Sequence, residues 1–438
     1  MSTIKNLIKK IVGERLVLMY HLVLAKLACA VYGNPSSKMT VIGVTGTKGK
    51  TSTVNYIWAA LNAGDIKTGV LSTVNFRIGD VQEVNDKHMT MPGRFFVQRK
   101  LREMVQAGCT HAVVETTSEG IKQHRASCID YSIAVFTNIS PEHLQSHGGS
   151  FDNYKQAKGK LFKMLSKHEG DTMILANTDS EYAPYFLSFP ATSKLTYSVN
   201  ADSSANYIAT DIEQDRDSVS FGLGDDKYVL NSPGTFNVYN ALPAVMLAKH
   251  FGVSVEDISN GLANIGTIPG RMEEIVEVGP LQFRVFVDYA HEETSLRAAL
   301  GTARSLANSE GKVIVLIGGQ GGGRDRAKRA LMGAAAAELA DVVIVANEDP
   351  YDDNPLEIIN EIADAAESPP AGGVGKVRGE NLFPIEDRRD AIKKALSLAS
   401  DGDVVLITGK GAEQTMIVKG KTIKWDDRNV VRECLIAE

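Results

Sequence analysis

The stretch Val41-Ile-Gly-Val-Thr-Gly-Thr-Lys-Gly-Lys-Thr-Ser-Thr53 decides the fold of this chain. It starts with an apolar run rich in β-branched residues, which favours a strand over Thr40–Thr45. A glycine-rich turn follows, and the next residues predict a helix over Ser52–Ala63. A strand, a glycine-rich loop and a helix N-terminus in this order are typical of a phosphate-binding loop.

Each residue type in this loop suits the binding of a polyphosphate. Gly46 and Gly49 allow the backbone to turn its N–H groups inward. We expect Lys50 to reach the terminal phosphates and the Thr51 hydroxyl to hold magnesium. Val44 occupies the first glycine position of the usual G-x-x-x-x-G-K-T pattern, so a plain glycine-rich turn beside a lysine is the alternative. The flanking strand and helix favour a nucleotide site formed by Gly46, Thr47, Lys48, Gly49, Lys50, Thr51 and Ser52.

Composition places the chain among ordinary globular proteins. Its 438 residues are enough for two or three domains, and 43% are hydrophobic and 23% charged. A net charge of −6 argues against a general nucleic-acid binder. The four cysteines form no C-x-x-C pair, which fits a reducing cytoplasm and excludes a zinc ribbon or disulfide framework.

The first 38 residues form a segment of their own. Four basic residues (Lys5, Lys9, Lys10 and Arg15) precede an apolar run from Leu16 to Tyr32, and Ala28-Cys-Ala30 resembles a cleavage site. Three interpretations remain open: a helix docked on the first domain, a signal peptide, or an interfacial helix that gives residues 1–36 peripheral membrane contact. The short link Gly33–Ser37 favours docking.

The rest of the chain predicts an α/β fold of two domains. Short apolar strands alternate with helical stretches, which is typical of a largely parallel sheet wrapped by helices. We expect a segment 1–38, a central P-loop domain over 39–270 and a C-terminal Rossmann-like α/β domain over 271–438, with a hinge at Pro269-Gly-Arg271. The central strands are expected at Thr40–Thr45, Lys67–Leu71, His111–Glu115, Ile133–Asn138 and Thr172–Asn177, before a β-rich excursion over Leu195–Leu230. The C-terminal strands are expected at Phe283–Asp288, Val313–Ile317, Val342–Val345 and Val404–Thr408. Further helices are expected at Phe151–Leu165, Val238–Phe251, Arg329–Ala340 and Leu356–Ala366.

Two strands of the central domain end in groups suited to metal or phosphate chemistry. Because the carboxyl ends of parallel strands share one crevice, Glu115 is expected beside Thr51, the alternative being a solvent-facing carboxylate. The next strand is followed by Glu142, His143 and His147, and then by Lys158 in a helix. Two histidines and an acid suit a metal site, although loop histidines are often structural.

The C-terminal strands end in three further polar loops. They are Asp288-Tyr-Ala-His291, the basic glycine-rich segment Gly318–Arg329 that contains Arg324, and Gly409-Lys-Gly-Ala-Glu413. Glycines with clustered arginines suit a carboxylate or phosphate, a solvated basic loop being the alternative. Two domains that turn such loops towards one cleft would suit the joining of two substrates at a nucleotide.

Taken together, these residues resemble the Mur ligase family, and within it the tripeptide synthetase (MurE-type) branch. The similarity runs from about residue 39 to 438. The motifs that carry it are Gly46–Thr51, Thr90-Met-Pro92, Glu115–Ser118, Thr137–His143, Ala157-Lys158, Gly234–Asn237 with Asn240, Pro269–Arg271, Asp288–His291 and Gly409–Gln414.

The resemblance implies a role for each motif residue. Lys50 would bind the β- and γ-phosphates of ATP, Thr51 and Glu115 one magnesium ion, and His143 with a carbamylated Lys158 a second. Lys50, Lys158, His143 and Glu115 would thus form the catalytic set. The nucleotide would also be bound by Asn240 at adenine, Asp288 at the ribose, Arg271 at the phosphates, and His291. The substrate-binding set would be Thr90, Pro92, Arg324, Asp349, Tyr351, Gly409 and Glu413.

The sequence also departs from the family pattern. Only about 38 residues precede the phosphate loop, where the family has a separate uridine-binding domain. Glu348-Asp-Pro-Tyr351 stands in place of the Asp-Asn-Pro-Arg signature, so the arginine that would clamp the distal carboxylate of diaminopimelate is a tyrosine. Glu119 and Ala412 stand where the family has histidine, and Gln145 where it has aspartate.

The function that we expect is ATP-dependent amide ligation through an acyl-phosphate, in the synthesis of peptidoglycan. Its partners would be small molecules, namely a carboxyl-bearing precursor and an amino acid or amine, and we expect a monomer. Two alternatives stay open: a nucleotide-binding partner protein without catalysis, and a ligase acting on a polyglutamate-like or lipid-linked substrate.

Overall fold

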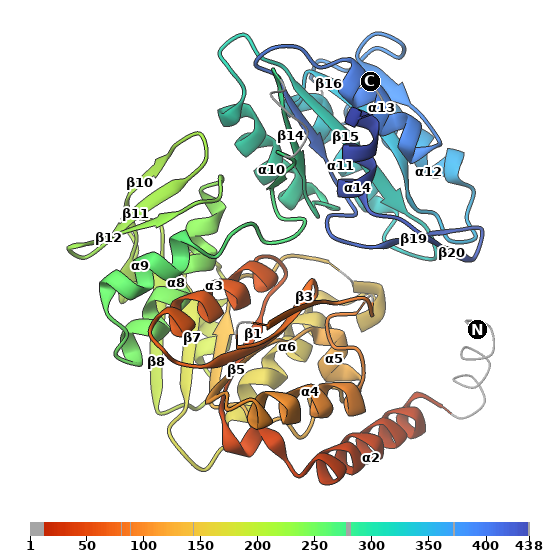
Figure 1. Cartoon of the computed structure of the whole chain (residues 1–438). Helices are drawn as coiled ribbons and strands as arrows, with labels where there is room; N and C mark the ends of the chain where they lie inside the picture. The colour runs from red at the N-terminus through yellow and green to blue at the C-terminus, as the bar shows by residue number, and fades with distance from the viewer. Residues whose placement is uncertain are drawn as a thin grey trace. The chain divides into compact units, whose positions relative to one another are not determined.

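The computed structural model describes residues 13–79, 81–87, 89–142, 144–276, 282–370 and 373–436. The chain divides into two compact units, each with its own sheet and helices (Figure 1). The first unit contains residues up to Glu213, Ser220–Asn231 and Asn237–Ile265, and the second contains Gln214–Val219, Ser232–Phe236 and Gly266–Glu438.

The first unit is built on a mostly parallel sheet. In the described ranges this sheet has nine strands in the order β4-β3-β2-β5-β1-β6-β7-β8-β9, parallel throughout from β2 to β9. The strands are β1 (Thr40–Thr45), β2 (Thr68–Leu71), β3 (Asn75–Ile78), β4 (Val81–Val84), β5 (His111–Glu115), β6 (Ile133–Phe136), β7 (Met173–Asn177), β8 (Ser193–Ser198) and β9 (Tyr207–Ile208).

The central strands end level with one another. Val44 of β1 pairs with Glu115 of β5, and Thr45 pairs with Phe136 of β6. The loops that follow these strands therefore leave the sheet at one edge. The helices of the unit are α2 (Glu14–Tyr32), α3 (Lys50–Ala63), α4 (Arg94–Gln106), α5 (Ser118–Lys122), α6 (Phe151–Leu165), α7 (Ala183–Leu187), α8 (Phe236–His250) and α9 (Val255–Ala263).

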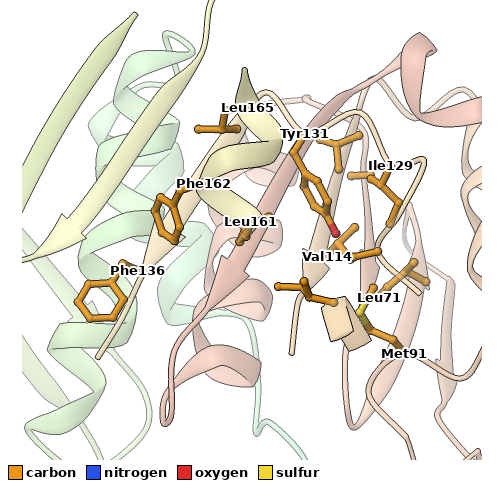
Figure 2. Packing of buried hydrophobic residues seen from close by; sticks show 14 of the residues in the cluster. Leu71, Met91, Val114, Ile129, Tyr131, Phe136, Leu161, Phe162 and Leu165 are labelled. Atoms are coloured by element: carbon orange, nitrogen blue, oxygen red, sulfur yellow. The ribbon is translucent and has the colours of Figure 1, made fainter. Parts of the chain in front are cut away.

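A continuous apolar core holds α6 against this sheet. Leu161, Phe162 and Leu165 point from α6 into the same cluster as Tyr131 and Val114 (Figure 2). Tyr131 is fully buried, and its hydroxyl and that of Thr116 lie 3.0 Å apart. Burial of these side chains fixes the position of α6 on the sheet. Because Lys158 is part of α6, its position relative to the strand ends is fixed as well.

The segment before β1 is a docked helix, as the short link predicts. Helix α2 packs against α4 and buries Ala25 and Ala28. It ends at Gly33, which adopts the left-handed conformation that closes many helices. The 3₁₀ turn η1 (Pro35–Lys38) then leads directly into β1.

The second unit has a six-stranded sheet in the described residues, in the order β13-β14-β18-β15-β16-β17. Only β13 is antiparallel to its neighbour. Alternate residues of the strands enter two separate cores: Val315 lies in one core, whereas Leu316 lies in the other. The strands are β13 (Glu273–Glu274), β14 (Arg284–Val287), β15 (Val313–Gln320), β16 (Val342–Asp349), β17 (Leu382–Pro384) and β18 (Val404–Ile407). The helices are α10 (Glu293–Leu306), α11 (Ala327–Leu339), α12 (Pro355–Glu367), α13 (Arg388–Ser397) and α14 (Asp427–Ile436).

The predicted fold class, two largely parallel α/β sheets, is confirmed. The β-rich excursion is also present, as a separate sheet of β10 (Thr210–Gln214), β11 (Val219–Leu223) and β12 (Asp226–Leu230). Predicted ends were wrong by a few residues, most clearly for β15 and β16. These two strands continue because Gly318 and Gly319 pair with Ala346 and Asn347 beyond the apolar runs.

Several short strands were missed by the sequence prediction. The antiparallel hairpin β3–β4 extends the first sheet, and β4 is exposed along its whole length. The second unit gains β17 and the hairpin of β19 (Thr415–Val418) and β20 (Lys421–Lys424). Each of these segments is only three or four residues long, which is too short for an alternation of apolar and polar residues to predict a strand.

Candidate active site

The loop between β1 and α3 is shaped by two close backbone approaches. Gly49 caps α3 in the left-handed conformation, with φ 78°. A Cβ atom at this position would lie 2.1 Å from Oδ1 of Asn240, and one on Gly46 would lie 1.9 Å from Oγ1 of Thr137. Both positions therefore require glycine.

The chain that leaves β6 holds this loop in place. The Thr47 N–H donates to the Asn138 carbonyl at 2.9 Å, and the Lys48 N–H donates to Oδ1 of Asn138 at 2.8 Å. Oγ1 of Thr137 donates to the Lys48 carbonyl at 2.7 Å. These three hydrogen bonds to residues after β6 hold the backbone of the loop in its turned conformation.

Two lysines of the loop make contacts with the protein itself. Nζ of Lys50 donates to the Thr47 carbonyl at 2.8 Å, which folds its ammonium back over the loop. Nζ of Lys48 lies 3.2 Å from the carboxylate of Glu142. Ser52 is buried in the first turn of α3. All of the predicted loop residues are thus gathered around one turn of backbone at a helix N-terminus.

The structure brings Thr51 and Glu115 together at the carboxyl edge of the sheet. Oγ1 of Thr51 donates to Oε2 of Glu115 at 3.0 Å, and Glu115 is only 2% exposed. The Thr73 N–H and hydroxyl also donate to this carboxylate, at 2.8 and 2.9 Å. The hydroxyls of Thr73 and Thr90 lie 2.8 Å apart, so the predicted substrate residue Thr90 belongs to the same hydrogen-bonded network.

Thr73 was missed by the sequence prediction. It follows β2, which neighbours β5, so the rule that placed Glu115 beside Thr51 could have identified it. Pro92 lies two residues after Thr90 and just before α4.

Lys158 lies on the inner side of α6, under the loop. Its Nζ donates to the Gly46 carbonyl at 2.6 Å and lies 4.5 Å from the centre of the Tyr154 ring. Burial, and next the charge of Lys50, hold the pKa of Lys158 well below its usual value. This shift favours the neutral amine, which is the nucleophilic form, more than in an ordinary lysine.

Of the two histidines that follow β6, the structure describes only His147. His143 lies outside the described residues. His147 is buried, and its Nε2 lies 3.1 Å from the Ser118 hydroxyl. Burial, with the charges of Lys122 and Lys158, lowers the pKa of His147. This histidine fits a structural role, the alternative that loop histidines leave open.

In the second unit, Asp288 accepts two backbone hydrogen bonds next to the residues predicted to bind the nucleotide. Oδ2 accepts from the Met272 N–H and Oδ1 from the Ala290 N–H, both at 2.8 Å. The Arg271 guanidinium lies over the Tyr289 ring at 4.6 Å, and Nδ1 of His291 is 2.8 Å from the Tyr289 carbonyl. Arg271, Asp288 and His291 are thus neighbours within this unit.

A buried lysine, Lys410, forms ion pairs with two carboxylates where β16 and β18 end. Nζ of Lys410 lies 2.8 Å from Asp349 and 2.6 Å from Glu413. Burial alone would lower the pKa of Lys410, but the charges of Glu413 and Asp349 outweigh it and raise that pKa. A Cβ on Gly409 would lie 2.8 Å from Oε2 of the buried Glu348, so this turn also requires glycine. The second unit thus places Asp349, Gly409 and Glu413 around one buried ammonium.

Tyr351 and the basic loop lie beside this cluster. Tyr351 has φ 56°, an uncommon value for a large side chain, and Nη2 of Arg324 lies 3.5 Å from its hydroxyl. Arg326 and Arg329 instead pair with Glu361 of α12. Of these arginines, the structure therefore brings Arg324 to the predicted substrate residues, while the other two serve to hold the loop on α12.

The donor set of the first unit fits magnesium in kind. Carboxylate and hydroxyl oxygens are the ligands that this ion prefers, and Thr51 and Glu115 supply both. The described residues contain no cluster of three or more histidine, cysteine, aspartate or glutamate side chains that could hold a metal ion by themselves. A phosphate oxygen or a modified lysine would have to complete the shell.

Comparison with known proteins identifies the family of this chain. A family model described as the Mur ligase middle domain matches residues 44–248, and one described as the Mur ligase, glutamate ligase domain matches residues 270–411. The chain is 38% identical over 429 residues to a UDP-N-acetylmuramyl-tripeptide synthetase of Roseiflexus sp. (strain RS-1). It is 36% identical over 416 residues to a UDP-N-acetylmuramoyl-L-alanyl-D-glutamate–2,6-diaminopimelate ligase of Caldanaerobacter subterraneus subsp. tengcongensis. Each alignment covers 94% of this chain and 81% of the relative.

Solved structures show the same architecture. A UDP-N-acetylmuramoyl-L-alanyl-D-glutamate–2,6-diaminopimelate ligase matches with a TM-score of 0.61 at 28% identity, over 91% of this chain and 78% of that one. A folylpolyglutamate synthase of Mycobacterium tuberculosis matches in fold with a TM-score of 0.70 at 19% identity, over 89% of this chain and 91% of that one. With both family models matched and these relatives aligned over 94% of this chain and 81% of their own length, the chain belongs to the Mur ligase family of ATP-dependent amide-bond ligases.

Proposed function

We propose that this enzyme adds an amino acid or another amine to the carboxyl group of a UDP-N-acetylmuramoyl-peptide, in cytoplasmic peptidoglycan synthesis. The observation that carries the proposal is the contact between Thr51 and Glu115 at 3.0 Å, beside an intact phosphate loop. The two relatives at 38 and 36% identity bear names of enzymes of this reaction type, which supports the substrate class.

The loop residues would bind and orient the triphosphate. Backbone N–H groups of the turn and the N-terminus of α3 attract phosphate oxygens, and Lys50 can swing from the Thr47 carbonyl to the terminal phosphates. The γ-phosphorus would then be open to attack by the carboxylate of the precursor. A carboxylate oxygen would form a bond to the γ-phosphorus as the bond from that phosphorus to the ADP oxygen breaks, which gives an acyl-phosphate. The amine would then form the C–N bond as the C–O bond to phosphate breaks, and it would lose a proton.

We propose two magnesium sites in the first unit. Thr51 and Glu115 would hold one ion, and His143 with Lys158 the other. Bound magnesium would neutralise the charge that develops on the transferred phosphoryl group. The bonds from Thr73 would keep the Glu115 carboxylate pointing towards Thr51 whether or not the ion is present.

Lys158 would serve as a ligand only after carbamylation. Its buried amine, with a lowered pKa, is suited to attack carbon dioxide; a C–N bond forms and one proton leaves to solvent. The product is a carboxylate, which reverses the sign of the charge at this position. The negative charge of the carbamate would be compensated by Lys50, the same charge that lowers the pKa of the free amine.

The remaining predicted residues would bind the rest of the substrates. Asn240, which lies against Gly49, is proposed at the adenine. We propose that Arg271 would bind the phosphates and Asp288 the ribose, with His291 as a further nucleotide residue. We propose Thr90 and Pro92 at the sugar–peptide. The acceptor would meet Arg324, Asp349, Tyr351, Gly409 and Glu413, and the enzyme would act as a monomer.

Phosphate release tests the proposal. Purified protein should release phosphate from ATP only when a muramoyl-peptide donor and an amine are both present, and Lys50→Ala should abolish this. Lys160→Ala is the matched control, because Lys160 is exposed on α6. Hydroxylamine should trap the acyl-phosphate as a hydroxamate. ATP binding without any trapped product would instead favour a nucleotide-binding partner protein without catalysis. Tyr351 and Ala412, which differ from the residues of the family pattern, are the observations that favour this alternative.

A further inference from the structure

Helix α2 presents a long apolar face that nothing in the first unit covers. Six large apolar side chains on this one helix are between 51 and 62% exposed: Leu16, Met19, Tyr20, Val23, Leu27 and Val31. Eighteen such exposed side chains occur in the described part of the chain, so a third of them lie in these 19 residues.

The spacing of these residues makes them one continuous stripe. Steps of three and four residues return to the same side of an α-helix, so the six side chains line up along it over about 22 Å. The opposite side is already occupied, because Ala25 and Ala28 are buried against the unit and α2 packs on α4. In Figure 1, α2 lies beside α4 as the red helix near the N-terminus. The exposed stripe is therefore the outer face of a docked helix.

The first 38 residues and the rest of the chain carry net charges of opposite sign. Residues 1–38 contain six basic residues and one acidic residue, a net charge of +5. The rest of the chain keeps 41 basic and 52 acidic residues, a net charge of −11. Three of the basic residues, Lys5, Lys9 and Lys10, come just before the helix, and Lys26 is exposed within it.

We propose that the outer face of α2 docks on the surface of an anionic lipid bilayer, with the helix lying in the plane of the membrane. Apolar side chains along one face with basic residues at its flank are the pattern of an interfacial helix. Anionic head groups would attract the +5 segment, and the −11 remainder would be repelled and held on the aqueous side. This inference goes beyond the ligase reaction, because it concerns where the enzyme works.

The same observations argue against two other roles for α2, a helix that crosses the membrane and a contact with a second copy of the chain. Helix α2 has the length and composition to cross a membrane, with a mean hydropathy of 1.5 over Arg15–Tyr32, but crossing would require Ala25 and Ala28 to leave the unit. A second copy seated face to face would bring two segments of charge +5 together, which like-charge repulsion opposes.

Vesicle sedimentation of the full-length protein tests the proposal. The protein should sediment with vesicles of phosphatidylcholine and phosphatidylglycerol, much less with phosphatidylcholine alone, and less in high salt. Replacing Met19, Val23 and Leu27 by glutamine should abolish binding while thermal unfolding is unchanged. Replacing Lys5, Lys9 and Lys10 by glutamine should weaken binding by about fivefold per lysine.

A matched variant separates this face from apolar exposure in general. Leu331→Gln with Leu356→Gln removes two leucines that are each 49% exposed on α11 and α12, and it should bind vesicles as the natural protein does. The proposal is overturned if the natural protein fails to bind anionic vesicles, or if the α2 variant binds equally well. It is also overturned if light scattering shows that the natural protein is a dimer and the α2 variant a monomer, since α2 would then pair with a second copy.

Discussion

Replacing Gly49 by alanine should weaken ATP binding as well as lower the free energy of unfolding. Gly49 has φ 78°, and the left-handed conformation costs an ordinary residue about 1–2 kcal/mol. The new Cβ would also lie 2.1 Å from Oδ1 of Asn240, so either the loop or the Asn240 carboxamide must move. Both surround the proposed nucleotide site.

Gly108→Ala provides the control. Gly108 has φ 81°, almost the same backbone strain, but a Cβ there meets nothing within 4 Å. Both variants should lose about 1–2 kcal/mol in the free energy of unfolding. Only Gly49→Ala should raise the Kd of ATP, by about tenfold or more, which corresponds to about 1.4 kcal/mol for a displaced loop.

The assay combines denaturant unfolding with calorimetric titration of ATP. Unfolding gives the strain shared by the two variants, and titration gives the contribution of the Asn240 contact. If Gly49→Ala binds ATP as tightly as Gly108→Ala, the loop does not cradle the nucleotide in the way that the structure implies.

Three further predictions follow from the two units. Glu115→Gln should keep the hydrogen bonds around Thr51 but lower kcat about 100-fold, with a higher magnesium requirement in a titration of turnover against the ion; an unchanged magnesium dependence would contradict the metal role. Tyr351→Arg should raise kcat/KM for an amine that carries a distal carboxylate by about tenfold, and an equal gain for amines without that carboxylate would show that no clamp was formed. The folded pKa of His147 lies below its usual 6.5, so the unfolded state binds more protons and stability should fall as the pH falls below about 6.5. His147→Gln should make the unfolding free energy less dependent on pH in that range, and an unchanged slope would mean that His147 is not the group responsible.

The sequence was sufficient for the parts of the site that depend on local pattern. The strand and helix around the phosphate loop have strong local signals, so β1 was predicted to the residue and α3 to within two residues. The meeting of Thr51 with Glu115 followed from one topological rule, that parallel strands end at a common edge.

Contacts between distant side chains were outside the reach of the sequence. The approach of Asn240 to Gly49 depends on how α8 packs beside the loop, and nothing local to either residue signals it. Likewise, the basic loop after β15 gave no sign that Glu361 would take up Arg326 and Arg329. Exposure on α2 could not be read from its apolar run, because a buried and a solvent-facing apolar helix have the same composition.

Mass spectrometry of the reaction products tests the central claim most directly. The full-length protein is incubated with ATP, magnesium, UDP-N-acetylmuramoyl-dipeptide and a mixture of amino acids that includes lysine and diaminopimelate. We predict one product that is heavier than the dipeptide by a single amino-acid residue, with one ADP and one phosphate released for each molecule formed. A dipeptide that stays unmodified while the protein binds ATP would contradict the assignment to muramoyl-peptide ligation.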